Sequence, residues 1–415
     1  MTLAGSPHEC LMCGLFQSLP ELPHGSTARC LRCAAPLAHG KTDPAGRALA
    51  FAATALLMLA LAVSQPFLAL DLRGQGQQTG LFTGASALVD RGMWELGVVV
   101  VFTTTVAPLM RIVGIVWVVI GLRLRRPPPH LARVFRLVEE LAPWSMVEVF
   151  MLGVFVAYTK LADLAMVHVG VAAYALGALM LAMAAADWAL DHAAVWREIA
   201  RRAPIAVRPE KPGPRIGCDD CGMVSHHRGM CPRCGGRLHH RKPDSLSRTW
   251  ALLIAAGLLY IPANILPVTT YIQLGQGSPD TILSGVEELA AGGQWPLAAL
   301  VFIASITVPM LKLCGLAVLL ISTQLRATGR LVERTRLYRI VEAVGRWSMI
   351  DVFVISVLTA LVRLGQLATI IPGPGVICFC AVVILTMLAA ESFDPRLMWD
   401  AAATRSPPRP QRIPA

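Results

Sequence analysis

The sequence predicts an all-α polytopic membrane protein, built as a tandem duplication of a four-transmembrane-helix module with a small cysteine-rich domain before each copy. Three observations predict this class. Apolar residues make up 55% of the 415 positions and charged residues only 15%, against about 25% in soluble proteins. A long sequence pattern occurs twice, and a double Cys-x-x-Cys motif stands before each half of the chain.

Long, nearly uncharged runs exceed the roughly 18 residues that mark a membrane-spanning helix. We expect eight spans, which cover residues 48–70, 96–122, 147–167 and 169–188, and then 250–272, 295–321, 350–371 and 375–390. Between the first two spans we expect a Gly/Gln-rich loop at 71–95. Residues 131–141 have apolar side chains on one helical face, which predicts an amphipathic helix lying along the bilayer surface.

The net charge of +11 is explained by arginines in the loops between spans, without a nucleic-acid partner. Arginine is frequent in Arg123–Arg136, Arg197–Arg248 and Arg326–Arg346, whereas Gln273–Gln294 contains no Lys or Arg. Because positively charged loops remain in the cytoplasm, this pattern places both termini there. Each module has an even number of spans, so we expect the two modules to be parallel copies.

The duplication is clearest in Arg136–Phe150, which reads RLVEELAPWSMVEVF and returns at Arg339–Phe353 as RIVEAVGRWSMIDVF. Upstream, Thr105–Arg111 (TVAPLMR) corresponds to Ile306–Lys312 (ITVPMLK). An internal repeat of this kind sets the domain plan. We expect a cysteine-rich ribbon at 1–40, a four-helix module at 41–200, a second ribbon at 201–245, a second four-helix module at 246–400 and a disordered tail at 401–415.

Eight cysteines form two sets of four thiols, namely Cys10, Cys13, Cys30 and Cys33, and Cys218, Cys221, Cys231 and Cys234. Two Cys-x-x-Cys turns place four thiolates around one metal, so each set predicts a small zinc-ribbon-like domain with four cysteine ligands. We expect two zinc ions, with iron as the main rival. Four sulfurs fill the coordination sphere, which favours a structural site over catalysis. Nucleic-acid binding by the ribbons is the weaker alternative.

Charged groups at membrane depth are costly and are therefore candidate transport residues. Lys312 lies about midway along its span after Pro309, far from either interface, and Arg111 after Pro108 is its counterpart. We expect an acid or hydroxyl from a neighbouring helix beside Lys312. Both prolines are expected to kink their helices and to free a carbonyl one turn earlier, although kinks also occur without a function.

Five further polar residues belong to this intramembrane set. Lys160 and Asp163 lie three positions apart on one helical face and can pair, or Lys160 can extend to the interface. Glu148 and Asp351 follow the two Trp-Ser-Met motifs at a helix start, where an acid also stabilises the helix N-terminus. Thr386 completes the set in the last span.

Motifs of common enzymes are missing from the sequence. There is no Walker loop, no Gly-x-Gly-x-x-Gly before a helix, no Gly-x-Ser-x-Gly and no His-Glu-x-x-His. We therefore expect no enzymatic activity and no nucleotide-driven step. A driving force would come from the proton gradient, through the intramembrane Lys and Asp groups, or from a lipid concentration difference.

The paired Cys-x-x-Cys motifs, the doubled WSM(V/I)(E/D)VF and the Pro-x-x-Lys span resemble the paraquat-inducible protein A family. The resemblance covers nearly the whole chain and is closest to the two-module, LetA-type members of the Gram-negative inner membrane. It implies an inner-membrane subunit of an intermembrane lipid transport system. Such a subunit loads phospholipid into a periplasmic MCE-domain tunnel protein or receives it from there. The resemblance also highlights Lys160, Asp163, Lys312 and Thr386.

Two other functions stay open at this point. One is a membrane anchor that holds a periplasmic partner without transport activity, and the other is a redox protein that handles quinones. The two halves also differ, because the first has Arg111 in place of Lys312 and lacks the Asn264-x-x-Pro267 of the second. This difference favours the second module as the holder of a working cavity.

Overall fold

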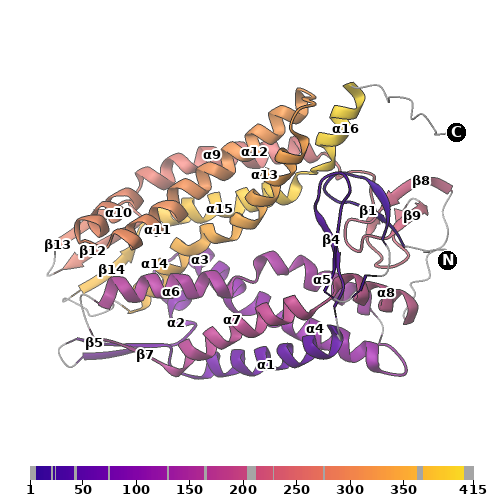
Figure 1. The fold of residues 1–415 in the computed structure, drawn as a ribbon. Helices are drawn as coiled ribbons and strands as arrows, with labels where there is room; N and C mark the ends of the chain where they lie inside the picture. Colours follow the sequence, from indigo (N-terminus) through magenta and orange to yellow (C-terminus); the bar gives the residue numbers. More distant parts are fainter. Residues whose placement is uncertain are drawn as a thin grey trace.

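The computed structural model is elongated, with two small ribbons at one end of a long helical bundle and two small sheets at the other (Figure 1). Asp163 lies outside the residues that the structure describes, as do positions 406–415 of the expected tail. The described residues are 6–19, 22–23, 25–41, 44–72, 75–128, 130–162, 166–202, 212–227, 229–273, 276–361 and 368–405.

Within the described residues, eight helical segments are long and apolar enough to cross a membrane, four in each half. The first half has α1 (Pro44–Ser64), α3 (Trp94–Val101) continued by the π-helix η1 (Phe102–Val106) and α4 (Ala107–Arg123), the segment Leu131–Lys160 that includes most of α6 (Val147–Ala162), and α7 (Val171–Ala189). The second half has α9 (Ser245–Ile265), α11 (Trp295–Phe302) continued by η3 (Ile303–Thr307) and α12 (Val308–Gln324), the segment Leu331–Leu361 that includes α14 (Ile350–Leu361), and α15 (Gly375–Ser392).

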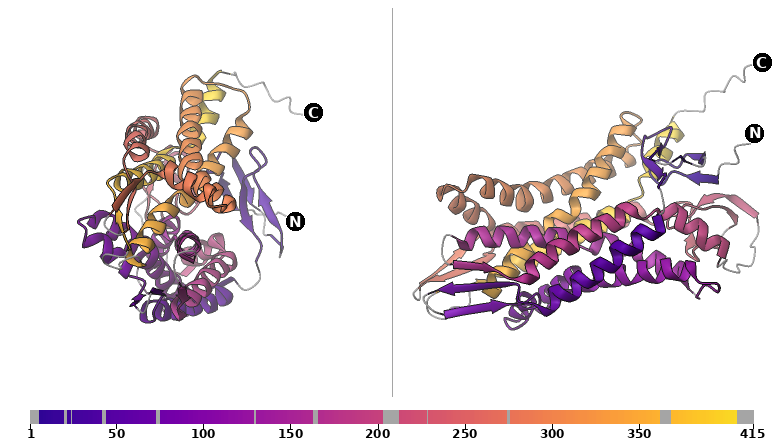
Figure 2. Two further views of the ribbon diagram at one scale, coloured as in Figure 1. Left: turned by 90° about the vertical axis from the view of Figure 1, so that its left-hand side faces the viewer. Right: turned by 60° about the horizontal axis from the view of Figure 1, so that its bottom comes forward.

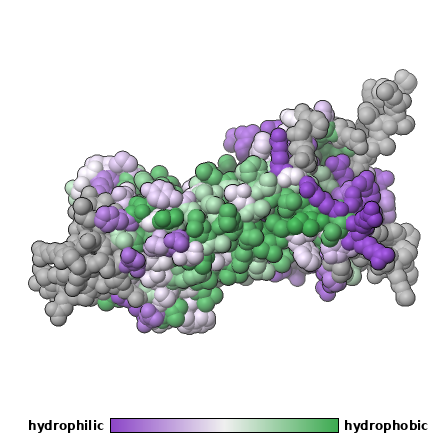
Figure 3. Space-filling model, turned by 90° about the horizontal axis from the view of Figure 1, so that it is seen from below, coloured by the Kyte–Doolittle hydropathy of each residue, from purple (hydrophilic) through white to green (hydrophobic). Residues whose placement is uncertain are grey.

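On the face shown in Figure 3, hydrophobic residues form a broad band across the middle of the bundle, and hydrophilic residues gather at the ribbon end. This is the surface expected of a protein whose middle lies in lipid. The predicted class, a duplicated four-helix membrane module with two four-cysteine domains, is therefore confirmed, and the chain is a multi-pass membrane protein.

Shorter elements complete each half. The helices are α2 (Thr83–Val89), α5 (Leu131–Glu140), η2 (Ala142–Trp144), α8 (His192–Arg202), α10 (Ile282–Ala291), α13 (Leu331–Val344), η4 (Gly345–Met349) and α16 (Arg396–Arg405). The N-terminal ribbon consists of the antiparallel hairpins β1–β2 (Ser6–Glu9, Phe16–Leu19) and β3–β4 (Thr27–Arg29, Pro36–His39). The central ribbon consists of β8–β9 (Pro212–Gly217, Val224–His227) and β10–β11 (Gly229–Met230, Arg237–Leu238).

A three-stranded antiparallel sheet closes the other end of each module. In the first sheet, β5 (Leu68–Leu72) pairs with β6 (Gln75–Thr79) and β7 (Met166–Val169); in the second, β12 (Thr269–Gln273) pairs with β13 (Gln276–Asp280) and β14 (Ala368–Pro372). The expected loop at 71–95 is therefore wrong, and so are the helical ends expected for the spans 48–70, 147–167, 250–272 and 350–371. A short apolar strand beside an apolar helix adds no hydropathy signal of its own.

The spans that contain Pro108 and Pro309 each include a π-helical turn that ends two positions before the proline. Pro108 and Pro309 are the second residues of α4 and α12, where the missing N–H of a proline is tolerated. In the first half the widened turn leaves the Thr103 carbonyl free to accept a hydrogen bond from the Met146 N–H at 3.2 Å. The π turn thus joins the second span to the first Trp-Ser-Met motif, and such turns are frequent at functional sites.

The repeated Trp-Ser-Met stretches lead into the two helices that join the modules, α6 and α14. A Cβ on Gly153 would lie 2.9 Å from that of Phe353, so the two helices approach closely at this point. The rings of Phe150 and Phe353 meet edge to face, with their centroids 5.5 Å apart. The most similar part of the duplication therefore lies at a contact between its two copies, and α14 also contacts α2 of the first module.

Helix α5 packs against protein, so the expectation that it lies along the bilayer surface is wrong. Its apolar side chains Leu131, Phe135 and Val138 are buried, and the helix contacts α4 and α8. Gly114 and Gly121 in α4 permit this contact, since a Cβ at these positions would lie 2.4 Å from Val138 and 2.8 Å from Leu131. Small residues allow two helices to approach in this way in membrane proteins.

Replacing Gly114 with alanine is expected to destabilise the first module by about 1–3 kcal/mol, because the added methyl overlaps the buried, β-branched Val138. The check is the thermal midpoint of the detergent-solubilised protein. Gly257 in α9 is the matched control: nothing lies within 4 Å of a Cβ built there, so Gly257→Ala should leave the midpoint unchanged or raise it. Equal midpoints for wild type and Gly114→Ala would contradict the packing described for α4 and α5.

Candidate functional site

The eight predicted metal-ligating cysteines form two buried groups of four free thiols. In the N-terminal ribbon, the Sγ atoms of Cys10 and Cys33 are 3.6 Å apart and those of Cys13 and Cys30 are 3.5 Å apart. The corresponding distances in the central ribbon are 3.4 and 3.5 Å. Four sulfurs held at about 2.3 Å from one metal lie roughly 3.8 Å from each other, so both groups fit a tetrahedral metal ion.

The knuckle turns hold these thiols through backbone geometry. The residue after the second cysteine of each knuckle has a positive φ: 71° at Gly14, 57° at Ala34, 68° at Gly222 and 72° at Gly235. Glycine adopts this conformation without strain, which explains three of the four residues. The Arg32 N–H also points to Cys30 Sγ at 3.4 Å, which orients that sulfur.

Hydrogen bonds among the thiols favour one thiolate in each cluster. In the N-terminal ribbon they lower the pKa of Cys33 to about 4 and raise the pKa of Cys13 above its usual range. In the central ribbon they hold the pKa of Cys231 far below its usual range and raise the pKa of Cys221. Because a metal binds the thiolate form, uptake of a metal ion displaces the protons of the remaining thiols.

The N-terminal ribbon docks against the second module, and Figure 2 shows it beside the C-terminal helix α16. The guanidinium carbon of Arg32 lies 4.4 Å from the ring centroid of Trp399 in α16, and the four thiols of this ribbon belong to the same hydrophobic cluster as Leu316 of α12. The central ribbon contacts the first module through Asp220 and Arg136 at 3.8 Å and the second module through Asp219 and Arg396 at 2.8 Å. The N-terminal ribbon therefore binds a module that does not directly follow it in the chain, whereas the central ribbon contacts both modules.

A buried ionic cluster fixes this arrangement. Glu9, which is 2% exposed, accepts a hydrogen bond from the Gly217 N–H at 2.7 Å and thereby joins the two ribbons. Arg396, also 2% exposed, contacts Asp394 at 2.9 Å and Asp219 at 2.8 Å. Burial raises the pKa of Glu9, and the positive charge of Arg396 partly offsets this increase. No sequence pattern indicated this cluster, because its members stand singly in polar segments that look like an ordinary surface.

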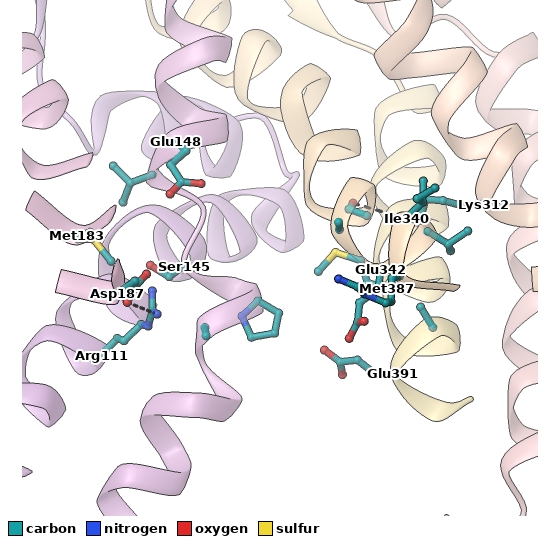
Figure 4. Close-up of a pocket in the computed structure, with 18 of the residues that line it drawn as sticks. Arg111, Ser145, Glu148, Met183, Asp187, Lys312, Ile340, Glu342, Met387 and Glu391 are labelled. Atoms are coloured by element: carbon teal, nitrogen blue, oxygen red, sulfur yellow. Dashed lines mark hydrogen bonds and ion pairs between the residues drawn. The ribbon is translucent and has the colours of Figure 1, made fainter. Parts of the chain in front are cut away.

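A cavity of about 660 Å³ lies between the two modules, and Met12 of the N-terminal ribbon places it at the ribbon end. Figure 4 shows two facing groups of side chains, one from each module. The first-module wall carries the polar residues Arg111, Ser145, Glu148 and Asp187. The second-module wall carries Lys312, Arg336, Arg339, Glu342 and Glu391. Apolar lining comes from Val147, Met180, Met183, Ile340 and Met387.

Lys312 is the most deeply buried cation of the cavity, at 1% exposure. Its Nζ donates to the Gly345 carbonyl in η4 at 3.5 Å. Among the described residues no carboxylate forms an ion pair with it, so the expected acid or hydroxyl partner is wrong and a backbone carbonyl takes that place. An ammonium group has three donors, which leaves two available to a ligand.

At the position in the first module that corresponds to Lys312, Arg111 forms an ion pair with a carboxylate. Arg111 is 9% exposed and contacts Asp187 at 2.5 Å. In the repeat, Ala-Ala-Asp187 of α7 corresponds to Ala-Ala-Glu391 of α15, so the matching pair would be Lys312 and Glu391, which do not pair with each other. In the part of the chain that the structure describes, Arg111 Nε and Ser145 Oγ are buried without a hydrogen-bond partner. The cavity thus holds polar groups that a ligand can satisfy.

The structure brings Arg111, Glu148 and Lys312 of the predicted set together at the cavity and places Lys160, Asp351 and Thr386 outside its lining, while Asp163 lies outside the described residues. Lys160 interacts electrostatically with Asp351, whose carboxylate hydrogen-bonds to Ser305 in the π turn η3. Thr386 is buried and donates to the Val383 carbonyl in its own helix. No sequence pattern singled out Ser145, Arg336, Arg339 or Glu342 as cavity residues; the regular spacing of charged residues along α13 was the one available signal.

Comparison with known proteins gives a consistent result. The family model described as paraquat-inducible protein A matches residues 46–200 and 246–403. The intermembrane transport protein PqiA of Escherichia coli K12 is 35% identical over 94% of this chain and 95% of the relative, and the lipophilic envelope-spanning tunnel protein A of the same strain is 34% identical over 96% and 92%. A probable intermembrane transport protein of Haemophilus influenzae is 26% identical over 94% and 95%. No solved structure matches.

Proposed function

This chain belongs to the paraquat-inducible protein A family, and from that premise we propose that it is the inner-membrane subunit of an intermembrane lipid transport system. Its relatives support a membrane role in intermembrane transport. The observation that carries the finer proposal is the inter-module cavity, in which the buried Lys312 lies beside the apolar Met387. A charged group next to an apolar wall suits a molecule with a polar head and an apolar tail.

The proposed partner is a periplasmic MCE-domain tunnel protein, which receives phospholipid from this chain or delivers it. The arginine-rich ribbon end faces the cytoplasm under the positive-inside rule, together with both termini. The two small sheets then lie at the periplasmic end, where such a partner would dock. Nucleic acid is not a partner in this proposal.

Transport is driven, in this proposal, by the proton gradient or by lipid concentration, since the sequence carries no nucleotide-binding motif. Lys312 is the leading group for proton coupling, because it is buried without an ion pair among the described residues. Lys160 and Asp351 interact electrostatically and form a second titratable pair within the spans. Chemistry on the lipid is not required, and the chain is proposed not to be an enzyme.

The metal of both four-cysteine clusters is proposed to be zinc, one ion in each ribbon. Four thiolates complete a tetrahedral shell and leave no open position for a substrate or water, so the ions act structurally. Their role is to hold ribbons that have too few core residues to fold alone.

Mass spectrometry and a visible spectrum of the same purified sample test the proposed function. We expect co-purifying phospholipid and no visible absorption band. A flavin, haem or iron–sulfur band would instead indicate redox activity. A colourless protein free of lipid would indicate a membrane anchor for a periplasmic partner.

A further inference from the structure

The charges that line the inter-module cavity balance each other. The cations are Arg111, Lys312, Arg336 and Arg339, and the anions are Glu148, Asp187, Glu342 and Glu391. A ligand with a net charge would remain partly uncompensated in such a recess and would pay a desolvation cost. The cavity therefore fits a ligand with one negative and one positive group better than an anionic one.

Buried side chains of the cavity provide the site for the negative group. Lys312 and Arg111 are 1% and 9% exposed, and Ser145 is 7% exposed. Lys312 has one hydrogen bond, to the Gly345 carbonyl, while Arg111 Nε and Ser145 Oγ have no partner in the described structure. The guanidinium of Arg111 and the hydroxyl of Ser145 lie on the same wall of the cavity and suit phosphate oxygens, while Lys312 faces them from the other wall.

Exposed side chains at the cavity rim provide the site for the positive group. Glu148 on the first-module wall and Glu391 on the second are both exposed, and Figure 4 shows them on opposite sides of the opening. Carboxylates accept hydrogen bonds from an ammonium group. Quaternary ammonium groups instead prefer aromatic faces, and none of the described lining residues is aromatic. A primary ammonium is therefore favoured over choline.

We propose that this cavity binds a phosphoethanolamine headgroup. Its phosphate contacts Arg111 and Ser145 on the first-module wall, and its ammonium contacts Glu148 on the same wall. The inference rests on the proposed lipid-handling function and specifies its substrate, a phospholipid that carries this zwitterionic headgroup.

Binding of defined lipids to the delipidated full-length protein tests this proposal. Native mass spectrometry is used with phosphatidylethanolamine, phosphatidylglycerol and phosphatidylcholine of the same chain length. We expect phosphatidylethanolamine to bind about fivefold more tightly than either of the others. The variant Glu148→Gln should lose this preference, whereas Glu288→Gln, on α10 outside the cavity, should keep it.

The outcomes separate this proposal from the function on which it rests. Equal or tighter binding of phosphatidylglycerol or phosphatidylcholine would overturn the headgroup assignment and leave lipid transport standing. Absence of binding by all three lipids would contradict the proposed function itself. Soluble glycerophosphoethanolamine should displace the lipid only at large excess; tighter binding of the soluble compound than of the lipid would show that the source is not the membrane.

Discussion

Replacing Lys312 with methionine is expected to reduce phospholipid transfer to the tunnel partner by about tenfold or more. Methionine is similar in length and keeps the packing around Gly345, but it removes the ammonium group from the centre of the cavity. A buried lysine costs a few kcal/mol at membrane depth, so the same change should keep or raise the thermal midpoint. Lost activity together with kept stability would separate a functional lysine from a structural one.

Lys41 provides the matched control for this experiment. Its Nζ also donates to a backbone carbonyl, that of Leu190 at 2.8 Å, but Lys41 does not line the cavity. The variant Lys41→Met should therefore transfer lipid like the wild type. Full lipid transfer by Lys312→Met would contradict a role of the cavity in transport and would favour a protein that only anchors a periplasmic partner.

Loss of a single ribbon cysteine should have the largest effect on stability. The purified protein is expected to contain two zinc ions, and Cys10→Ser is expected to contain one. Structural zinc contributes roughly 10 kcal/mol to small zinc domains, and the thiols of this ribbon belong to the same hydrophobic cluster as Leu316 of the second module. The variant should therefore lose the N-terminal ribbon and the ionic contacts of Glu9, with a clear fall in thermal midpoint.

Elemental analysis and thermal unfolding in detergent check this expectation. Cys314 in α12 is an exposed cysteine outside both clusters, so Cys314→Ser should keep two ions and the wild-type midpoint. Two zinc ions in Cys10→Ser would contradict the assignment of the four ligands, and iron in the wild type would replace zinc as the resident metal.

Local sequence patterns were sufficient for the membrane plan. Hydropathy predicted a span at 169–188, and the structure has α7 at Val171–Ala189. The spacing of the cysteines predicted both clusters, because four ligands within one short segment have to meet. The sheets were missed since Met166–Val169 is as apolar as the helix before it, and a strand of four residues is too short to show its alternation.

Contacts between distant segments were beyond the reach of such patterns. Glu9 and Arg396 stand near opposite ends of the chain, and neither has a neighbour in sequence that marks it as buried. The ion pair between Arg111 and Asp187 could not be predicted either, because it depends on the contact between α4 and α7 at these two positions. Burial of Lys312 followed from its depth in the span, but its carbonyl partner in η4 did not.

The most direct test of the central claim, that lipid occupies the cavity between the modules, is site-specific photo-crosslinking in cells. A photoreactive residue replaces Met387, which lines the cavity beside Lys312, and in a separate variant it replaces Ile377, an exposed residue of the same helix. We expect a phospholipid adduct at position 387 that disappears when Lys312→Met is added, while the adduct at position 377 with bulk lipid persists. No adduct at position 387, or one that Lys312→Met leaves unchanged, would contradict the account.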